Sequence, residues 1–335
     1  MAEVVYREVV VLYEHPSWFD DLFAFLEERS ITHARVHVSD IKYCPDMVDG
    51  SSIVMKNGVT ISRDKSLVLN RVSAVPHHIS EPSFLPYYQN FLRYLELLGV
   101  PVVNGSASYA VGLSKALQYT ILQKNGAKVP RSRVVRSQEE IVDALGDLQF
   151  PILFKPNTGG SGAGIIRWTT RDEAEAEFSG GTLIPFGLDG VGLLQEYHRP
   201  KGGCIYRVEI LNHEFLYGLV VPVLDGSFNY CPADGCNIDR AQQQGAFNQC
   251  PLERKKAGAL DLTPYAPTPE EVDVSKRTLS DCSCDLGSVE FLISERDGEH
   301  YYFDVNPLSN FVGNAKELVD TNPYERLLSL ILVPQ

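Results

Sequence analysis

A glycine-rich loop between two apolar segments constrains this chain more than any other feature of its sequence. Residues 157–164 hold four glycines in eight positions, and glycine lets backbone N–H groups converge on a phosphate without side-chain obstruction. The loop lacks the Gly-Lys-Ser/Thr ending of a Walker A loop and the G-x-G-x-x-G spacing of a dinucleotide fold. Strand-like segments flank it at 151–155 and 165–169. The pattern predicts a phosphate-covering flap between two strands, and a hairpin loop without a ligand is the alternative.

Two lysines bear on this choice. Lys155 ends the apolar segment 151–154, two residues before the loop, where its ammonium can reach a phosphate that the loop covers. Lys115 lies in a predicted helix beside apolar residues, and by itself it is expected to be an ordinary solvated lysine. Lys155 therefore favours the phosphate-binding interpretation of the loop.

Acidic side chains interrupt two predicted strands near the end of the chain. Asp304 and Asn306 are two residues apart in one strand, so their side chains share a face. A loop of residues 296–298 places Glu290 of the preceding strand opposite Asp304, whereas a loop one residue shorter places it opposite Val305. We predict the longer loop, because it gathers three oxygen ligands of the kind that Mg²⁺ prefers. A half-exposed sheet face with scattered polar groups is the alternative.

Strand, helix and strand alternate over the first hundred residues, which predicts a small parallel α/β unit. The predicted strands are 8–14, 33–38, 67–70, 100–103, 151–155, 165–169, 193–197, 206–211, 214–223, 288–294 and 300–306. The predicted helices are 18–28, 87–98, 114–124 and 323–330, with two more that begin at Ser137 and Thr170. Residues 225–270 are rich in Gly, Pro, Gln and Asn, and we expect long loops there.

Composition excludes several classes of protein. The net charge of −13 disfavours a nucleic-acid partner, which calls for a basic surface. The sequence has no apolar run approaching the roughly 20 residues that span a bilayer, and residues 1–8 lack a signal-peptide core. Seven cysteines, none paired at the two-residue spacing of a zinc knuckle, favour free thiols in a reducing compartment. We therefore expect a cytoplasmic protein without membrane or nucleic-acid partners.

These parts, in this order, resemble the ATP-grasp superfamily from about residue 104 to 314. More narrowly, they are similar to carboxylate–amine ligases of the ribosomal-protein-S6 glutamate-ligase kind. The resemblance implies an α/β and α+β architecture, in which two α+β lobes clamp a nucleotide behind a small parallel α/β pre-ATP-grasp domain. The domains expected are 1–104, then 105–192 with the phosphate flap, and 193–335 with the metal triad and substrate loops.

The resemblance also assigns site residues. The implied nucleotide-binding residues are Lys115, Lys155, Gly159, Gly160, Ser161, Gly162, Gly164, Gln195, Glu196, Tyr197 and Lys201. Among them, residues 195–197 form the interdomain hinge whose backbone bonds the adenine edge. Arg207 joins Lys155 as a catalytic residue near the phosphates. The implied metal ligands, for two Mg²⁺ ions, are Glu290, Asp304 and Asn306. The family often has a ribose-binding acidic residue where this chain has Ile205, so the ribose contact stays open between Glu196, Lys201 and the backbone.

The activity implied is ATP-dependent joining of a small carboxylate, an amino acid or peptide, to an amine through an acyl-phosphate, with release of ADP and phosphate. The substrate residues expected are Arg71, Asn229, Arg240, Ser309 and Asn310, and an arginine suits a carboxylate. The partners are small molecules, and a homo-oligomer is compatible with the sequence. The alternatives are an ATP-binding regulatory protein without turnover and an enzyme with a thiol or hydroxyl acceptor. A dehydrogenase is disfavoured, because no G-x-G-x-x-G follows the first strand.

Overall fold

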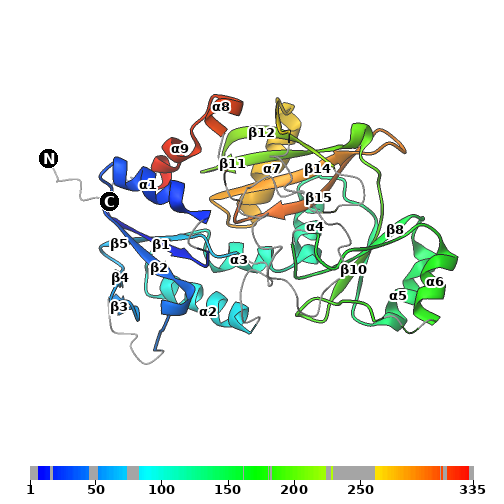
Figure 1. Ribbon diagram of the computed structural model, residues 1–335, viewed down its shortest axis with the longest axis horizontal. Helices are drawn as coiled ribbons and strands as arrows, with labels where there is room; N and C mark the ends of the chain where they lie inside the picture. Colours follow the sequence, from blue (N-terminus) through cyan, green and yellow to red (C-terminus); the bar gives the residue numbers. More distant parts are fainter. Residues whose placement is uncertain are drawn as a thin grey trace.

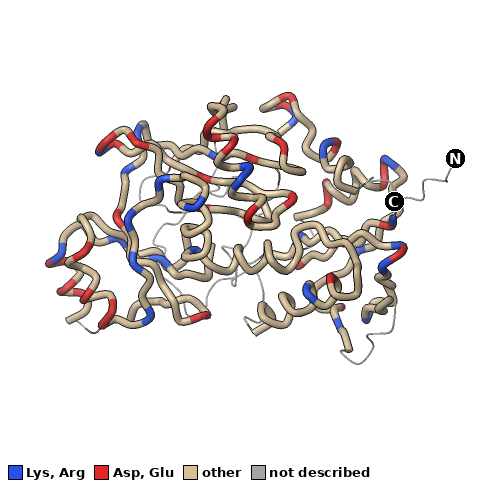
Figure 2. Tube along the Cα trace, turned by 180° about the vertical axis from the view of Figure 1, so that it is seen from behind, with Lys and Arg blue, Asp and Glu red and all other residues tan. Residues whose placement is uncertain are grey.

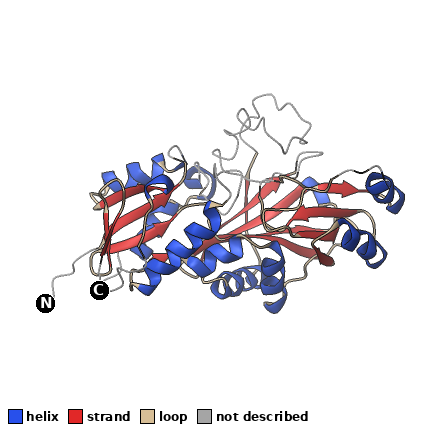
Figure 3. Cartoon of the chain, turned by 90° about the horizontal axis from the view of Figure 1, so that it is seen from below, coloured by secondary structure: helices blue, strands red, loops and turns tan. Residues whose placement is uncertain are grey.

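The computed structural model describes residues 7–15, 18–44, 52–73, 83–160, 162–179, 181, 183–223, 228, 261–309, 311 and 315–331. Three main sheets follow one another along the chain, with helices packed against their faces (Figures 1 and 3). Acidic and basic positions occur in all three parts of the described trace (Figure 2). None of the described helices has the length and apolar character needed to cross a membrane.

The first sheet is parallel and has the strand order β2-β1-β5-β6. Its elements are β1 (Glu8–Tyr13), α1 (Asp20–Glu28), β2 (His33–His37), β5 (Ser66–Asn70), α2 (Phe84–Leu97), β6 (Val102–Val103) and α3 (Ser106–Gly112), with a small hairpin of β3 (Ser52–Val54) and β4 (Thr60–Ser62). Val9 and Val11 of β1 lie in one core with residues of α1, whereas Val10 and Leu12 lie in a second core with residues of α2. Burial on both faces explains why β1 is continuously apolar.

The second sheet is antiparallel and carries the glycine-rich loop. Its order is β7-β10-β8-β9, formed by β7 (Ser132–Val135), β8 (Ile152–Pro156), β9 (Ile166–Trp168) and β10 (Gly192–Glu196). Helices α5 (Gln138–Ala144) and α6 (Arg171–Ser179) cover one face, in a core that holds Ile152 and Phe154. Because side chains alternate along a strand, Leu153 and Lys155 point to the other face and line a cleft.

The third sheet is antiparallel and has the order β13-β12-β11-β14-β15. Its strands are β11 (Cys204–Leu211), β12 (Glu214–Pro222), β13 (Thr263–Tyr265), β14 (Leu286–Ile293) and β15 (His300–Asn306). Helices α4 (Lys115–Lys124) and α7 (Pro269–Asp281) share a core with Val289 and Phe291 on one face. Helix α4 thus packs on the third sheet, although it precedes the second sheet in the sequence.

The end of the described chain returns to the first sheet. Helices α8 (Ala315–Val319) and α9 (Pro323–Ile331) follow β15, and α9 lies beside α1 (Figure 1). Leu327 and Ile331 of α9 share a core with Leu22 of α1 and with Ile205 of the third sheet. The rings of Tyr324 and Phe25 stack at 5.6 Å. This core joins the first and third sheets, so their facing surfaces are held together.

Most predicted strands and helices are present within a few residues of their expected bounds. Helix α7 was not expected, and its N-terminal residues fall in the segment predicted as long loops. A local signal for it existed, since Thr268 and Glu271 form a capping box and proline occupies the first turn. The helix was missed because its buried face includes polar residues, Glu271, Ser275 and Thr278, which weakens its apolar periodicity.

We predict that Thr268→Ala lowers the free energy of unfolding by about 1 kcal/mol. The substitution removes the hydroxyl that accepts a hydrogen bond from the Glu271 amide at 3.3 Å, and urea unfolding measures the loss. Thr268→Ser keeps the hydroxyl and should remain close to the wild type. An equal loss in both variants would contradict the capping role.

Candidate active site

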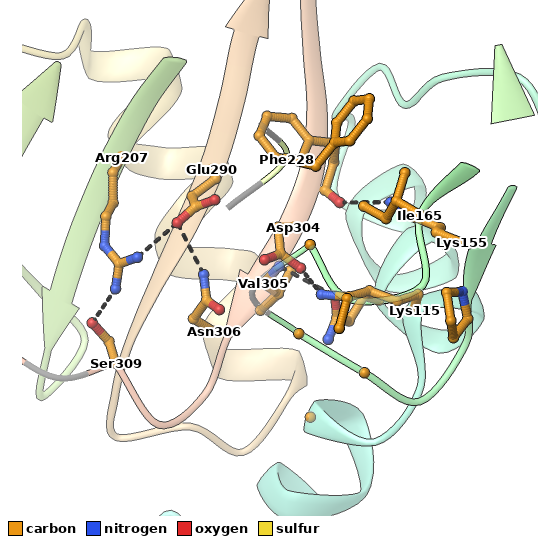
Figure 4. Close-up of a pocket in the computed structure, with 18 of the residues that line it drawn as sticks. Lys115, Lys155, Ile165, Arg207, Phe228, Glu290, Asp304, Val305, Asn306 and Ser309 are labelled. Carbon is orange, nitrogen blue, oxygen red and sulfur yellow. Dashed lines mark hydrogen bonds and ion pairs between the residues drawn. The ribbon is translucent and has the colours of Figure 1, made fainter. Parts of the chain in front are cut away.

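A cleft of about 230 Å³ lies where the three sheets meet. The second and third sheets form its two walls, and residues of the first sheet close one end. The predicted site residues that line it are Arg71, Lys115, Lys155, Gly159, Gly160, Gly162, Gln195, Tyr197, Arg207, Glu290, Asp304, Asn306 and Ser309. The labelled ones among them converge from both walls (Figure 4). Residues far apart in the sequence therefore share one cavity.

Lys155 projects from β8 and is buried. Its ammonium donates to the hydroxyl of Tyr119 at 2.8 Å and to the Phe303 carbonyl at 3.4 Å. Burial and, to a smaller extent, the nearby Lys115 lower the pKa of Lys155 to about 7, although Asp304 acts in the opposite direction. An anionic group entering the cleft would relieve this unfavourable state of the lysine.

Lys115 reaches the same space from the third sheet's side of the cleft. It is the first residue of α4, which begins at the N-cap Ser114, and its ammonium forms an ion pair with the Asp304 carboxylate. The sequence alone did not indicate that Lys115 pairs with Asp304. Taken alone, Lys115 was expected to be solvated, but its side chain is only 13% exposed.

Glu290 and Asp304 are directly opposite each other on β14 and β15. The predicted pairing is therefore confirmed, but the predicted loop of residues 296–298 is wrong. Ser294 pairs with Glu299, so the loop is one residue longer, 295–298. The register shifts between Glu290 and Phe291, because Phe291 pairs with Tyr302 while Glu290 pairs with Asp304. Phe303 is the extra residue of this β-bulge, and it compensates for the longer loop.

The donor set of the hairpin fits a hard cation. The Asn306 side-chain amide donates to Glu290 Oε1 at 3.2 Å, which leaves the Asn306 amide oxygen available beside the two carboxylates. Burial raises the pKa of Glu290 to about 7, even though the Arg207 guanidinium lowers it. Among the described residues, no group of three or more His, Cys, Asp or Glu side chains could hold a metal ion. A cation here would thus need Asn306 and oxygens of a bound ligand to complete its coordination.

Arg207 lies at the centre of a buried network. Its Nη1 donates to Glu290 at 2.6 Å and its Nε donates to Glu209, also at 2.6 Å. Its Nη2 donates to the Ser309 hydroxyl at 2.5 Å, and that hydroxyl in turn donates to Glu209 at 2.7 Å. Burial opposes the positive charge, but Glu209 and Glu290 outweigh burial and raise the pKa of Arg207. The guanidinium is held in one orientation with its Nη atoms toward Glu290 and Ser309.

The glycine-rich loop places three of its four glycines, Gly159, Gly160 and Gly162, along the cleft. Gly164 does not line the cleft. It has a positive φ of 73°, and a Cβ atom there would lie 2.8 Å from Pro156, so this position requires glycine for backbone reasons. Ser161 lies outside the described residues.

The predicted hinge is only partly directed into the cleft. Gln195 and Tyr197 line it, whereas the Glu196 carboxylate turns away and accepts from the Gln149 amide at 3.0 Å. The backbone amides of Glu196 and Tyr197 donate to carbonyls of the protein, so those two amides are not available to an adenine ring. Lys201 is exposed and is not among the described residues that line the cleft.

The end of the cleft nearest the first sheet holds two of the predicted substrate residues. Arg71 follows β5 and donates to the backbone carbonyl of Ser309 at 2.7 Å. Burial lowers the pKa of Arg71. Glu14, which follows the neighbouring parallel strand β1, lines the same end. Carboxyl ends of parallel strands are where ligands of such sheets bind. Asn229, Arg240 and Asn310 lie outside the described residues.

Three described residues that hold Lys155, Arg207 and Asn157 in place were not predicted from the sequence. Tyr119 fits the pattern of an ordinary core residue of a helix. The signal for it is that it lies four residues after Lys115 and therefore on the same face. Glu209 could have been found from its spacing, since it lies two residues after Arg207 in the same strand and so on the same face. Asp189 lies in a loop, and its bond to Asn157 at 2.6 Å joins segments that no local pattern connects.

We predict that Lys155→Met raises the melting temperature at pH 7 by about 2–4 °C, the shift that ~1 kcal/mol gives in a large domain. Since the folded pKa is about 7 and the ordinary value is 10.5, the cost of the buried charge is complete below pH 7 and disappears as the pH approaches 10.5. Calorimetry at pH 6.5 and pH 10 should therefore show a gain that shrinks with pH. A gain independent of pH would contradict this origin.

Comparisons with known proteins place most of the cleft residues in a known domain family. Residues 113–260 match the model of the RimK-like ATP-grasp domain. A urea amidolyase of Saccharomyces cerevisiae is 23% identical over 300 residues, which are 84% of this chain and 15% of that protein. The ribosomal protein bS6–L-glutamate ligase of Shigella boydii is 26% identical over 170 residues, 50% of this chain and 52% of the ligase. The chain thus spans only part of the length of these relatives.

The fold has solved counterparts. The structure of the ATP-grasp ligase PsnB complexed with a minimal precursor superposes with a TM-score of 0.65, at 14% identity, over 96% of this chain and 97% of the ligase. At that identity the likeness concerns the fold. Together with the match over residues 113–260, it shows that the chain has the ATP-grasp fold and carries a RimK-like ATP-grasp domain.

Proposed function

We propose that this chain is an Mg²⁺- and ATP-dependent ligase that joins a small carboxylate, an amino acid or a peptide, to an amine. The observation that carries the proposal is the convergence of two lysines and two carboxylates across one cleft, with the ion pair of Lys115 and Asp304 and the burial of Lys155. A polyphosphate needs cations on one side, and its magnesium needs carboxylates on the other. The substrate carboxylate would attack the γ-phosphorus of ATP, giving ADP and an acyl-phosphate. The amine substrate would then attack the acyl carbon and displace phosphate.

The residues of the chain have distinct roles in this proposal. Lys115 and Lys155 bind phosphate oxygens, and Arg207 stabilises charge on the transferred phosphoryl or acyl-phosphate group. Glu290, Asp304 and Asn306 hold Mg²⁺, which neutralises phosphate charge when it is bound. The glycine-rich loop covers the phosphates and excludes water, which would otherwise hydrolyse the activated acyl group.

The substrates are assigned by position. Arg71 and Ser309 lie beyond Arg207, at the end of the cleft nearest the first sheet, and an arginine suits the carboxylate substrate. The hinge contributes Gln195 and Tyr197 at the nucleotide end, and the adenine edge is left to hinge carbonyls or to the following amide, that of His198. We further propose two Mg²⁺ ions, a cytoplasmic location and the three-part division at about residues 104 and 192.

Known relatives support this assignment. The bS6–L-glutamate ligase is named for ligation to an amino acid. PsnB has been solved in a complex with a precursor variant, Mg and ADP, which is consistent with a nucleotide and magnesium in this fold. D-alanine–D-alanine ligase of Paracidovorax citrulli is 33% identical over 85 residues, 25% of this chain. All three proteins are named as ligases.

We predict that the protein releases ADP and phosphate from Mg-ATP only when a pool of amino acids and small carboxylates is present. Lys155→Ala should lower this rate by about 10²-fold or more, the effect of losing one preorganised charge contact. Lys128→Ala is the matched control, because that lysine is exposed and lies outside the cleft lining. Mass spectrometry distinguishes the products. AMP in place of ADP would contradict the acyl-phosphate route.

A further inference from the structure

Asn157 connects the start of the glycine-rich loop to two other segments of the chain. It follows β8 directly and is buried, with 6% of its surface exposed. Its side-chain oxygen accepts from the Ala116 amide at 2.9 Å and from the Ser114 hydroxyl at 3.2 Å. Its side-chain NH₂ donates to Asp189 at 2.6 Å. Both ends of this amide are therefore used, each by a different segment.

The contact to Ala116 fastens the loop to the N-terminus of α4. The first amides of a helix lack partners within the helix, and here Asn157 supplies partners for two of them. The Lys115 amide donates to the Asn157 carbonyl at 3.1 Å, and the Thr158 hydroxyl donates to the Leu113 carbonyl at 2.7 Å. Four hydrogen bonds thus join the base of the loop to the residues around Lys115.

Asp189 and the Ala116 amide together fix which way the Asn157 side-chain amide points. An ionised carboxylate accepts hydrogen bonds and donates none, whereas an Asn side chain has one accepting and one donating end. The NH₂ group must therefore face Asp189, and the oxygen must face the donors of α4. Asp189 is itself held, because its second oxygen accepts from the Val191 amide at 3.2 Å. A rotated amide would set its NH₂ against the Ala116 N–H and its oxygen against the Asp189 carboxylate.

Helix α4 also positions Lys155, through Tyr119. Tyr119, one turn after Lys115, accepts from the Lys155 ammonium at 2.8 Å and donates to Gln195 at 2.7 Å. The helix itself is packed into the core of the third sheet. Lys115, Lys155 and the base of the glycine-rich loop are consequently all positioned relative to one helix.

We propose that Asn157 and Asp189 are a pair of positioning residues that lock the base of the glycine-rich loop to α4. The pair aligns Lys115 and Lys155 with the loop before a ligand arrives, so it sets the affinity for the phosphate portion of a nucleotide. Preorganisation of this kind strengthens binding, since less ordering remains to be done in the complex. This inference rests on the proposed function, because it assumes that the cleft binds a nucleotide.

The test exchanges the two side chains. Asn157→Asp places a carboxylate against Asp189, and ADP should then bind about tenfold more weakly by calorimetry, a change typical of losing a charge-assisted contact. Asp189→Asn still offers an oxygen to Asn157 and should stay within about threefold of the wild type. The double variant N157D/D189N restores one donor and one acceptor, and it should recover most of the lost affinity.

Two controls separate positioning from folding. Adenosine, which lacks phosphates, should bind equally to the wild type and to N157D. Asn57→Asp changes an exposed turn residue of the hairpin of β3 and β4 and should leave ADP affinity unchanged. If N157D does not fold, Thr158→Val removes only the hydroxyl bond to Leu113 and should weaken ADP binding by about two- to fivefold.

The outcomes are distinguishable. A wild-type chain that binds ADP, together with an N157D variant of equal affinity or a double variant without recovery, overturns the positioning pair alone. Equal weakening of ADP and adenosine also overturns it, because the effect would then be general. A wild-type chain that binds neither ADP nor ATP contradicts the proposed function itself, and the role of the pair with it.

Discussion

The β-bulge at Phe303 is the constraint on which the cleft depends. Tyr302 and Asp304 are two residues apart, so a regular strand would point both side chains to one face. Tyr302 belongs to the core beneath α4 and α7, where an unpaired carboxylate would be costly. The extra residue lets Tyr302 remain in that core while Asp304 turns to the cleft opposite Glu290. One inserted residue therefore creates the pair of carboxylates.

The charges around that pair are arranged for a ligand rather than for stability. Lys155 is buried beside Lys115, and the pKa of Lys155 is lowered to about 7, so the folded chain carries a destabilising group. Arg207 has two carboxylate partners, Glu209 and Glu290. It would keep Glu209 if a metal ion occupied Glu290, and a buried guanidinium without a partner would be costly. Sites that favour function over stability have this character.

Local sequence patterns predicted the helices, strands and motifs of this fold better than the registers and long-range contacts between them. The glycine-rich loop and Lys155 follow from spacing within single segments, whereas the pairing of Glu290 with Asp304 depends on a register between two strands. The longer loop at 295–298 and the bulge at Phe303 could not be derived, because each shifts the register by one residue and the two shifts cancel at Glu290 and Asp304. The bonds of Asn157 and the packing of α4 on the third sheet are long-range, and α7 was missed because its buried face is partly polar.

The central claim is that this cleft binds a metal–nucleotide complex between its lysines and its carboxylate hairpin. A crystal structure with Mn²⁺ and a non-hydrolysable ATP analogue, recorded with anomalous scattering from manganese, tests it most directly. The account predicts a manganese peak about 2.1 Å from oxygens of Glu290 and Asp304, with Lys115 moved from Asp304 to a phosphate oxygen. Nucleotide bound elsewhere, or manganese bound away from Glu290 and Asp304, would contradict the account.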